Sequence, residues 1–124
     1  MSRTTTQKAT GHVGEAIAAN FLESLGYRIV DRNVRFPVGE LDLVAWHCGT
    51  LVFVEVKTRR KQGATSAVDA VHTAKQRRLI RAADLYLSKT GLSPAETRFD
   101  VVIIEGIGEE TTCTLVSRAF EDFR

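Results

Sequence analysis

The chain has 124 residues, of which 44% are hydrophobic and 26% are charged, and its formal net charge is +2. This length fits one domain, which buries about two thirds of its unfolded surface and needs no disulfide or metal to fold. No apolar run approaches the roughly 18 residues of a membrane span, and the polar N-terminus lacks the core of a signal peptide. The sequence therefore predicts a cytoplasmic protein without a membrane partner, and the spacing of its cysteines and histidines argues against structural zinc.

Positive charge is concentrated in the middle third of the chain. Between Val56 and Lys89 there are nine basic and two acidic side chains, a net +7, whereas the segments on either side are net negative. Such a distribution is consistent with a surface that faces nucleic-acid phosphates. It is equally consistent with a solvated Lys/Arg face of a helix, and charge alone does not separate the two.

The first elements are predicted by apolar spacing and by glycine. Residues 1–10 are polar and are expected to be a disordered tail, which leaves 11–124 as a single domain. A helix is predicted from Thr10 or Gly11 to the C-terminal cap at Gly26. Its apolar positions recur at helical spacing: Val13, Ile17, Phe21 and Leu25. A strand over 27–35 follows.

The remaining chain predicts a mixed α/β domain. Two strands over 41–46 and 50–58 are separated by a tight turn, and a helix is expected over 68–87. The nearly continuous apolar run over 99–104 is typical of a strand that is covered on both faces. An edge strand over 111–116 and a short terminal element over 119–123 complete the chain. The predicted core is αβββαβ, with a mixed central sheet flanked by helices.

The tight turn fixes a register for the hairpin. With Cys48 and Gly49 at its centre, facing residues have numbers that sum to 97, so Asp42 faces Glu55 and Glu40 faces Lys57. Alternation predicts one apolar face, which includes Leu41, and places the four charged residues together at the open end of the other face.

Two directly opposed carboxylates repel each other, so Asp42 facing Glu55 needs an explanation. A divalent cation between them, or a proton on one of them, would relieve the repulsion. Oxygen-only ligands suit Mg²⁺ or Mn²⁺, and Lys57 on the same face could stabilise the charge of a phosphate. The alternative for Glu-x-Lys at a strand end is a solvated cross-strand ion pair, here between Glu40 and Lys57.

Several segments together resemble a known family. The sequence is similar to the YraN-type family of small bacterial proteins, which look like PD-(D/E)XK nucleases with a restriction-endonuclease-like core, nearest to archaeal-type Holliday junction resolvases. The resemblance runs from Gly11 to about Phe120. The segments that carry it are Gly14-Glu15, Gly39-Glu40-Leu41-Asp42-Leu43-Val44-Ala45, Leu51-Val52-Phe53-Val54-Glu55-Val56-Lys57-Thr58-Arg59, Lys75-Gln76-Arg77-Arg78 and Arg98-Phe99-Asp100-Val101-Val102.

The resemblance implies a role for each matching residue. Asp42 and Glu55 would be metal ligands, Lys57 the catalytic lysine, and Glu15 a further acid that reaches the site from the first helix. Gln76 matches a polar position on the second helix that also belongs to such sites. The sequence departs from the family name at one point, because a leucine precedes Asp42 where the Pro-Asp dipeptide has proline.

These observations together predict a Mg²⁺- or Mn²⁺-dependent enzyme that hydrolyses DNA, including branched DNA. Basic residues after Lys57 and on the second helix would contact the phosphates: Arg59, Arg60, Lys61, Lys75, Arg77, Arg78 and Arg81. The alternative is a non-catalytic nucleic-acid-binding or adaptor domain on a nuclease scaffold. A homodimer is expected by analogy with related resolvases. Asp100 is expected to pair with a neighbouring Arg or Lys, and His47 to be structural.

Overall fold

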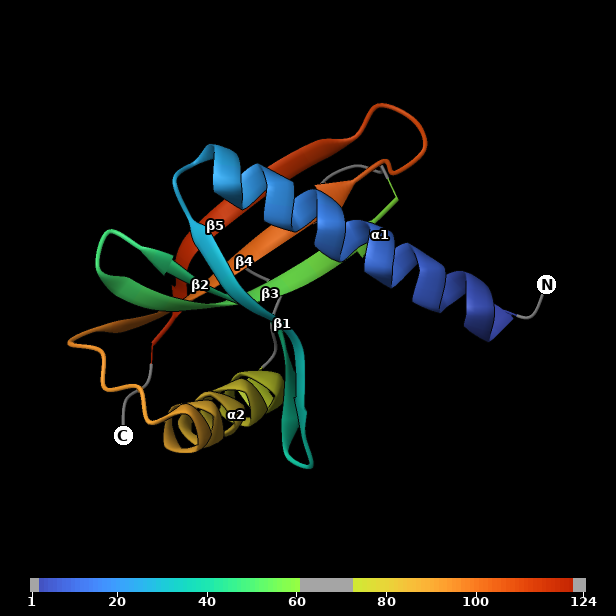
Figure 1. Cartoon of the computed structure of the whole chain (residues 1–124). Helices are drawn as coiled ribbons and strands as arrows, with labels where there is room; N and C mark the ends of the chain where they lie inside the picture. The colour runs from blue at the N-terminus through green and yellow to red at the C-terminus, as the bar shows by residue number, and fades with distance from the viewer. Residues whose placement is uncertain (1–2, 61–72, 122–124) are drawn as a thin grey trace.

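The computed structural model of the chain describes residues 3–60 and 73–121, and for residues 3–11 it describes the backbone alone. Within these described residues, two helices and five strands follow one another in the order αβββαββ (Figure 1). Their bounds are α1 Arg3–Ser24, β1 Arg28–Phe36, β2 Gly39–His47, β3 Thr50–Arg59, α2 Thr73–Thr90, β4 Thr97–Glu105 and β5 Thr112–Phe120.

The five strands form one mixed sheet in the order β1-β2-β3-β4-β5. Strands β3 and β4 are parallel, and every other neighbouring pair is antiparallel. The chain passes from β3 to β4 by way of α2, as a parallel connection requires a crossover. This mixed sheet with flanking helices confirms the predicted αβββαβ core.

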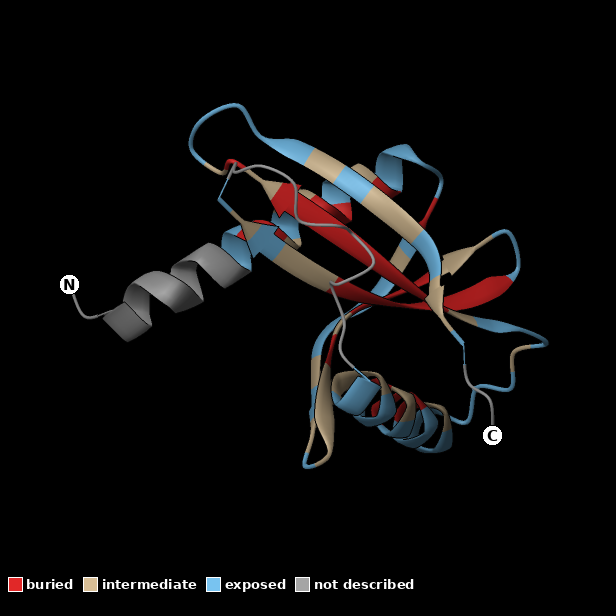
Figure 2. Cartoon of the chain, turned by 180° about the vertical axis from the view of Figure 1, so that it is seen from behind, coloured by how far each residue is buried: buried red, intermediate tan, exposed pale blue. Residues whose placement is uncertain are grey.

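The two helices cover opposite faces of the sheet, and each closes a separate apolar cluster. Ala18, Ala19 and Leu22 of α1 pack on one face, against residues of β2, β3 and β4. On the other face, Leu79 and Tyr86 of α2 pack against the same strands. Figure 2 shows the buried residues concentrated along the central strands. Both faces of the β2–β3 hairpin are therefore covered, one by each helix.

The turn between β2 and β3 has the predicted form. Cys48 and Gly49 both have positive φ values, 51° and 81°, as a type I′ turn requires. His47 pairs with Thr50, and the pairing continues to Leu43 and Val54, so facing numbers sum to 97 as expected. The turn residues therefore set the register that leads to the candidate site.

Some predicted boundaries were wrong. The first helix begins at Arg3 and not at Thr10 or Gly11, because Thr-rich segments lower helix propensity by only fractions of a kcal/mol per residue. Strand β5 continues to Phe120 and so includes the start of the expected terminal element. The expected start of the second helix at Val68 lies outside the described residues. Within the described segments, neither helix is long and apolar enough to cross a membrane.

Candidate functional site

Strand β2 separates from β3 immediately beyond Leu43. Its last pair with β3 is Leu43–Val54, whereas its pairing with β1 continues to Gly39, and Figure 1 shows the β1–β2 hairpin bending away toward α2. At the point of separation, the backbone N–H of Val56 donates to Asp42 Oδ2 at 2.8 Å. The opening between the two strands is therefore held by the side chain of Asp42.

The side chains of Asp42 and Glu55 interact at this opening, although the ladder that was expected to pair the two residues ends one pair earlier, at Leu43–Val54. The pKa of Asp42 is raised to about 8, chiefly by burial and then by the negative charge of Glu55, while the hydrogen bond from Val56 opposes both effects. Glu15 and a hydrogen bond with Glu55 add to the upward shift. Near neutral pH the metal-free pair therefore retains a proton, one of the two ways to relieve the repulsion of facing carboxylates.

Glu15 reaches this opening from α1, as the resemblance implies. Oxygens of Glu15, Glu40 and Asp42 all lie within 4.8 Å of one another. Burial raises the pKa of Glu15, and the charge of Glu40 adds to the shift. In the amide orientation that directs its nitrogen to the helix, Asn33 donates to Glu15 Oε1 at 3.0 Å. The group offers only carboxylate oxygens, the donor set that fits Mg²⁺ or Mn²⁺.

Gly14 allows α1 to approach the sheet closely enough for Glu15 to reach the opening. A Cβ atom at Gly14 would lie 2.5 Å from Thr58 Cγ2 on β3, closer than side-chain atoms pack. Gly39 marks a second close approach, where a Cβ atom would lie 3.1 Å from the carbonyl oxygen of Arg78 on α2. Both glycines stand beside acids of the site, and both bring a helix against the strand that carries an acid.

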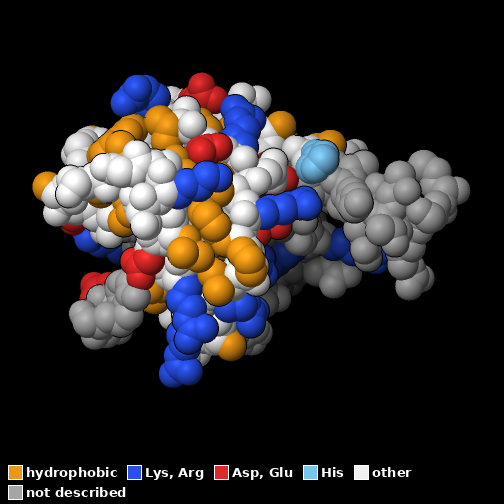
Figure 3. Space-filling model, turned by 60° about the horizontal axis from the view of Figure 1, so that its bottom comes forward, with side chains coloured by type: hydrophobic (Ala, Val, Ile, Leu, Met, Phe, Trp, Pro, Cys, Tyr) orange, Lys and Arg blue, Asp and Glu red, His pale blue; other side chains and the backbone are white. Residues whose placement is uncertain are grey.

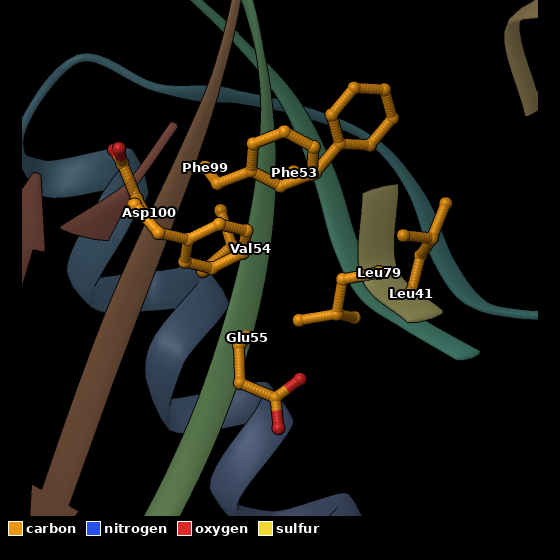
Figure 4. Close-up of a pocket in the computed structure, with 8 residues that line it drawn as sticks. Leu41, Phe53, Val54, Glu55, Leu79, Phe99 and Asp100 are labelled. Carbon is orange, nitrogen blue, oxygen red and sulfur yellow. The ribbon is translucent and has the colours of Figure 1, made fainter. Parts of the chain in front are cut away.

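Glu55 is a buried carboxylate with two lysines beside it. Its side chain is 5% exposed, and in Figure 4 it shares one side of β3 with the apolar side chains of Phe53 and Leu79. Lys75 Nζ on α2 lies 2.5 Å from Glu55 Oε1, and Lys57 Nζ lies 4.0 Å from the same oxygen. Lys57 and Glu55 thus emerge on one face of β3, as alternation predicts.

The pKa values of the two lysines are shifted in opposite directions. Burial lowers the pKa of Lys57, and the positive charge of Lys75 lowers it further, against the effect of Glu55. Burial would also lower the pKa of Lys75, but the hydrogen bond and the charge of Glu55 outweigh it, so that pKa is raised. The stronger ion pair of Glu55 is therefore with the lysine from α2.

The prediction that Glu40 faces Lys57 was wrong. Because β2 and β3 separate before this position, Glu40 lies beside Arg35 of β1, with 3.7 Å between Arg35 Nε and Glu40 Oε1. Leu41, expected on the same face as Leu43, packs instead in the cluster covered by α2. The alternation along β2 is thus interrupted between Leu43 and Leu41.

The predicted phosphate contacts that the structure describes lie at the end of β3 and on α2. Arg59 is the partly buried last residue of β3, Arg60 follows it exposed, and Gln76 is partly buried on α2 beside Lys75. Lys61 lies outside the described residues. The three arginines of α2 are all exposed: Arg77, Arg78 and Arg81. Figure 3 shows Lys and Arg side chains in several separate groups, with apolar side chains and carboxylates between them.

The sequence alone does not assign the site roles of three residues. It predicts Glu40 on the same face as Asp42, but as a partner of Lys57 and not as a member of the carboxylate group. Lys75 was considered only as a phosphate contact. Asn33 carried no signal, because its contact with Glu15 joins β1 to α1 across a long stretch of sequence.

A second polar cluster lies at the turn end of the hairpin, away from the acids. Asp100 is fully buried, accepts hydrogen bonds from Arg98 Nε at 2.9 Å and Tyr27 Oη at 2.7 Å, and receives the backbone N–H of Arg118 at 3.0 Å. His47 stacks on Tyr27 with 4.0 Å between ring centroids. The expected ion pair of Asp100 is confirmed, and the cluster ties β4 to β5 and to the start of β1.

Comparison with known proteins identifies relatives along most of the chain. The model of the family described as "Uncharacterised protein family UPF0102" matches residues 14–104. A UPF0102 protein of Symbiobacterium thermophilum is 51% identical over 114 residues, 91% of this chain and 97% of the relative. UPF0102 proteins of Syntrophotalea carbinolica and Geobacter sulfurreducens are 46% and 48% identical, over 90% and 78% of this chain and 90% and 76% of the relatives. The chain therefore belongs to the UPF0102 family.

Proposed function

We propose that this protein is a metal-dependent endonuclease that hydrolyses phosphodiester bonds of DNA, with branched DNA among its substrates. The observation that carries the proposal is the meeting of Asp42 and Glu55 at the separation of β2 and β3, with Lys57 two residues beyond Glu55. A carboxylate-only site for a hard cation next to an ammonium group suits phosphoryl chemistry, in which charge on the phosphate oxygens must be offset.

Each acid has a defined part in this proposal. Asp42 and Glu55 would hold Mg²⁺ or Mn²⁺, and Glu15 and Glu40 extend the carboxylate group on the α1 side. When bound, such an ion lowers the pKa of a water and offsets phosphoryl charge. Lys57 would pair with the phosphate oxygens. Hydrolysis would join a water oxygen to phosphorus and break one P–O ester bond, which leaves one phosphate end and one hydroxyl end.

The basic residues of the neighbouring elements would position the nucleic acid. Exposed arginines on α2 and Arg59 and Arg60 after Lys57 can pair with phosphates on either side of the cut. Contacts of this kind carry no base specificity, which agrees with recognition by nucleic-acid shape. A homodimer is the assembly that suits a substrate with two equivalent strands, and light scattering of the purified protein with and without branched DNA tests it.

The decisive test is cleavage of linear duplex and four-way branched DNA in Mn²⁺. The wild type should cleave, whereas Asp42→Ala and Lys57→Ala should lose at least about a hundredfold in rate, by analogy with removal of other charge-stabilising groups. Lys89→Ala, which removes an exposed lysine at the far end of α2, is the matched control and should cleave normally.

Two results would contradict the proposal. Equal cleavage by all four proteins would remove Asp42 and Lys57 from the chemistry. Salt-sensitive DNA binding with no cleavage and no uptake of Mn²⁺ in calorimetry would instead favour a non-catalytic nucleic-acid-binding or adaptor domain.

A further inference from the structure

Lys75 lies on α2, close to the point where the described part of that helix begins at Thr73. The role of this lysine is inferred from its tertiary contacts.

The tertiary contact of Lys75 is with Glu55. Lys75 Nζ lies 2.5 Å from Glu55 Oε1, closer than the lysine of the Glu-x-Lys segment, whose Nζ lies 4.0 Å from the same oxygen. The carboxylate is 5% exposed, while the side chain of Lys75 is 36% exposed. A buried carboxylate requires a counter-charge, and here a partly exposed side chain from another element supplies it.

The same carboxylate is a ligand in the function proposed above, on which this inference rests. The ammonium group of Lys75 neutralises this carboxylate and so competes electrostatically with a divalent ion for it. We propose that Lys75 is an internal counter-ion of Glu55 that occupies the metal-free site and is displaced by Mg²⁺ or Mn²⁺. Its length and partial exposure let it leave without unfolding α2, and the released ammonium is then available to a phosphate.

Competition between Lys75 and a divalent ion predicts the direction in which the affinity for Mn²⁺ changes when Lys75 is removed. Removal of Lys75 eliminates a cation that opposes entry of the divalent ion, so Lys75→Met should bind Mn²⁺ at least about tenfold more tightly than wild type. In the absence of metal, the same variant leaves Glu55 without its nearest partner and should melt at a lower temperature than wild type. The shift in melting temperature on adding Mn²⁺ should then be larger for the variant.

The experiment is titration calorimetry with Mn²⁺ alone, together with thermal melts in EDTA and in Mn²⁺. Lys75→Gln repeats the loss of charge with a polar side chain, so that the result does not depend on the folding of one variant. Lys89→Met removes an exposed lysine from the last turn of the same helix and should match wild type in both measurements.

The outcomes separate this inference from the function on which it rests. If wild type binds Mn²⁺ and both Lys75 variants bind it no more tightly, Lys75 is only a structural ion-pair partner and the inference is wrong. If wild type takes up no Mn²⁺ at all, the metal site itself is wrong, and the inference falls with it. Tighter binding by both Lys75 variants, with Lys89→Met unchanged, supports the displacement.

Discussion

Asp42 Oδ2 accepts the backbone N–H of Val56 at 2.8 Å, and this bond replaces a rung of the sheet. If the register of the hairpin continued beyond Leu43, the N–H of Val56 would bond to the carbonyl oxygen of Leu41. The carboxylate of Asp42 accepts this hydrogen bond in place of the Leu41 carbonyl, at the point where β2 separates from β3. The same side chain thus satisfies the backbone at the opening and presents an acid to it.

Asp42→Asn should stabilise the metal-free protein at alkaline pH. The folded protein holds a proton at Asp42 up to about pH 8, whereas the unfolded chain releases it near pH 4. Folding therefore binds a proton in this window, and the free energy of unfolding falls as the pH rises through it. Asparagine can still accept from Val56 but carries no charge, so the variant loses this part of the pH dependence.

The measurement is a series of thermal melts in EDTA from pH 5 to pH 9. At pH 5 the two proteins should melt within about a degree of each other, and at pH 9 the variant should melt several degrees higher, as a change of about 1 kcal/mol or more produces in a domain of this size. A variant that melts lower at every pH would show that Asp42 is not destabilising when ionised.

Binding of Mn²⁺ should release a proton. At pH 7 Asp42 is largely protonated in the metal-free protein, since its pKa is raised to about 8, and a carboxylate must be ionised to bind metal. Calorimetry at pH 7 in two buffers of different ionisation enthalpy should detect the release of nearly one proton per binding event. The number should fall toward zero above pH 9, and heats that are the same in both buffers at pH 7 would contradict the assignment.

Gly14→Ala should destabilise the packing of α1 on β3. The new Cβ would meet Thr58 Cγ2 at 2.5 Å, and overpacking of this kind costs about 1–3 kcal/mol, while alanine stabilises a helix by about 1 kcal/mol relative to glycine. The net loss should be up to about 2 kcal/mol in urea unfolding, and affinity for Mn²⁺ should fall as Glu15 is carried away from Asp42.

Combining Gly14→Ala with Thr58→Ser tests whether the clash with Thr58 Cγ2 causes the loss of stability. Thr58→Ser removes the Cγ2 methyl group that the new Cβ would meet. Gly14→Ala combined with Thr58→Ser should be at least as stable as Thr58→Ser alone, because only the gain in helix propensity remains. Equal losses from Gly14→Ala in both backgrounds would show that this contact does not limit the approach of α1.

Asp100→Asn should lower the free energy of unfolding much more than Glu96→Gln, which disrupts an exposed ion pair. Asp100 is fully buried with the guanidinium of Arg98, so neutralising it leaves a charge in the interior, a change that costs about 3–5 kcal/mol. Glu96→Gln disrupts the ion pair with Arg118, whose side chains are 53% and 60% exposed, and should cost less than about 1 kcal/mol. Urea unfolding of both variants measures the difference, and comparable losses would contradict the structural role of the cluster.

The sequence predicts the order of the elements because each carries its own local signal. Turn residues Cys48 and Gly49 set the register of the hairpin, and extending that register predicts that Asp42 lies near Glu55. The apolar run of β4 likewise indicated a strand covered on both faces. Glu15 came from the family resemblance, since its helical position alone is also compatible with an exposed side chain.

Apart from the element boundaries, the errors concern places where tertiary packing overrides a local pattern. Alternation assumes that paired strands stay paired, and so it failed for Glu40 and Leu41, which lie beyond the separation of β2 from β3. The pairing of Lys75 with Glu55 depends on how α2 docks on the sheet, which spacing within the helix cannot reveal. The basic charge of the middle third was read as a surface property, yet one of its members balances a buried acid.

The helices on the two faces each deliver one group to the opening in the sheet, Glu15 from α1 and Lys75 from α2. Neither helix alone supplies both groups. They reach the same acids because β2 and β3 separate at this point, so that side chains from both faces of the sheet can approach. A chain that has docked only one helix, as during synthesis or partial unfolding, would hold an incomplete set of groups. The site is therefore complete only when both helices are docked on the sheet. Its reactivity then depends on the completion of folding.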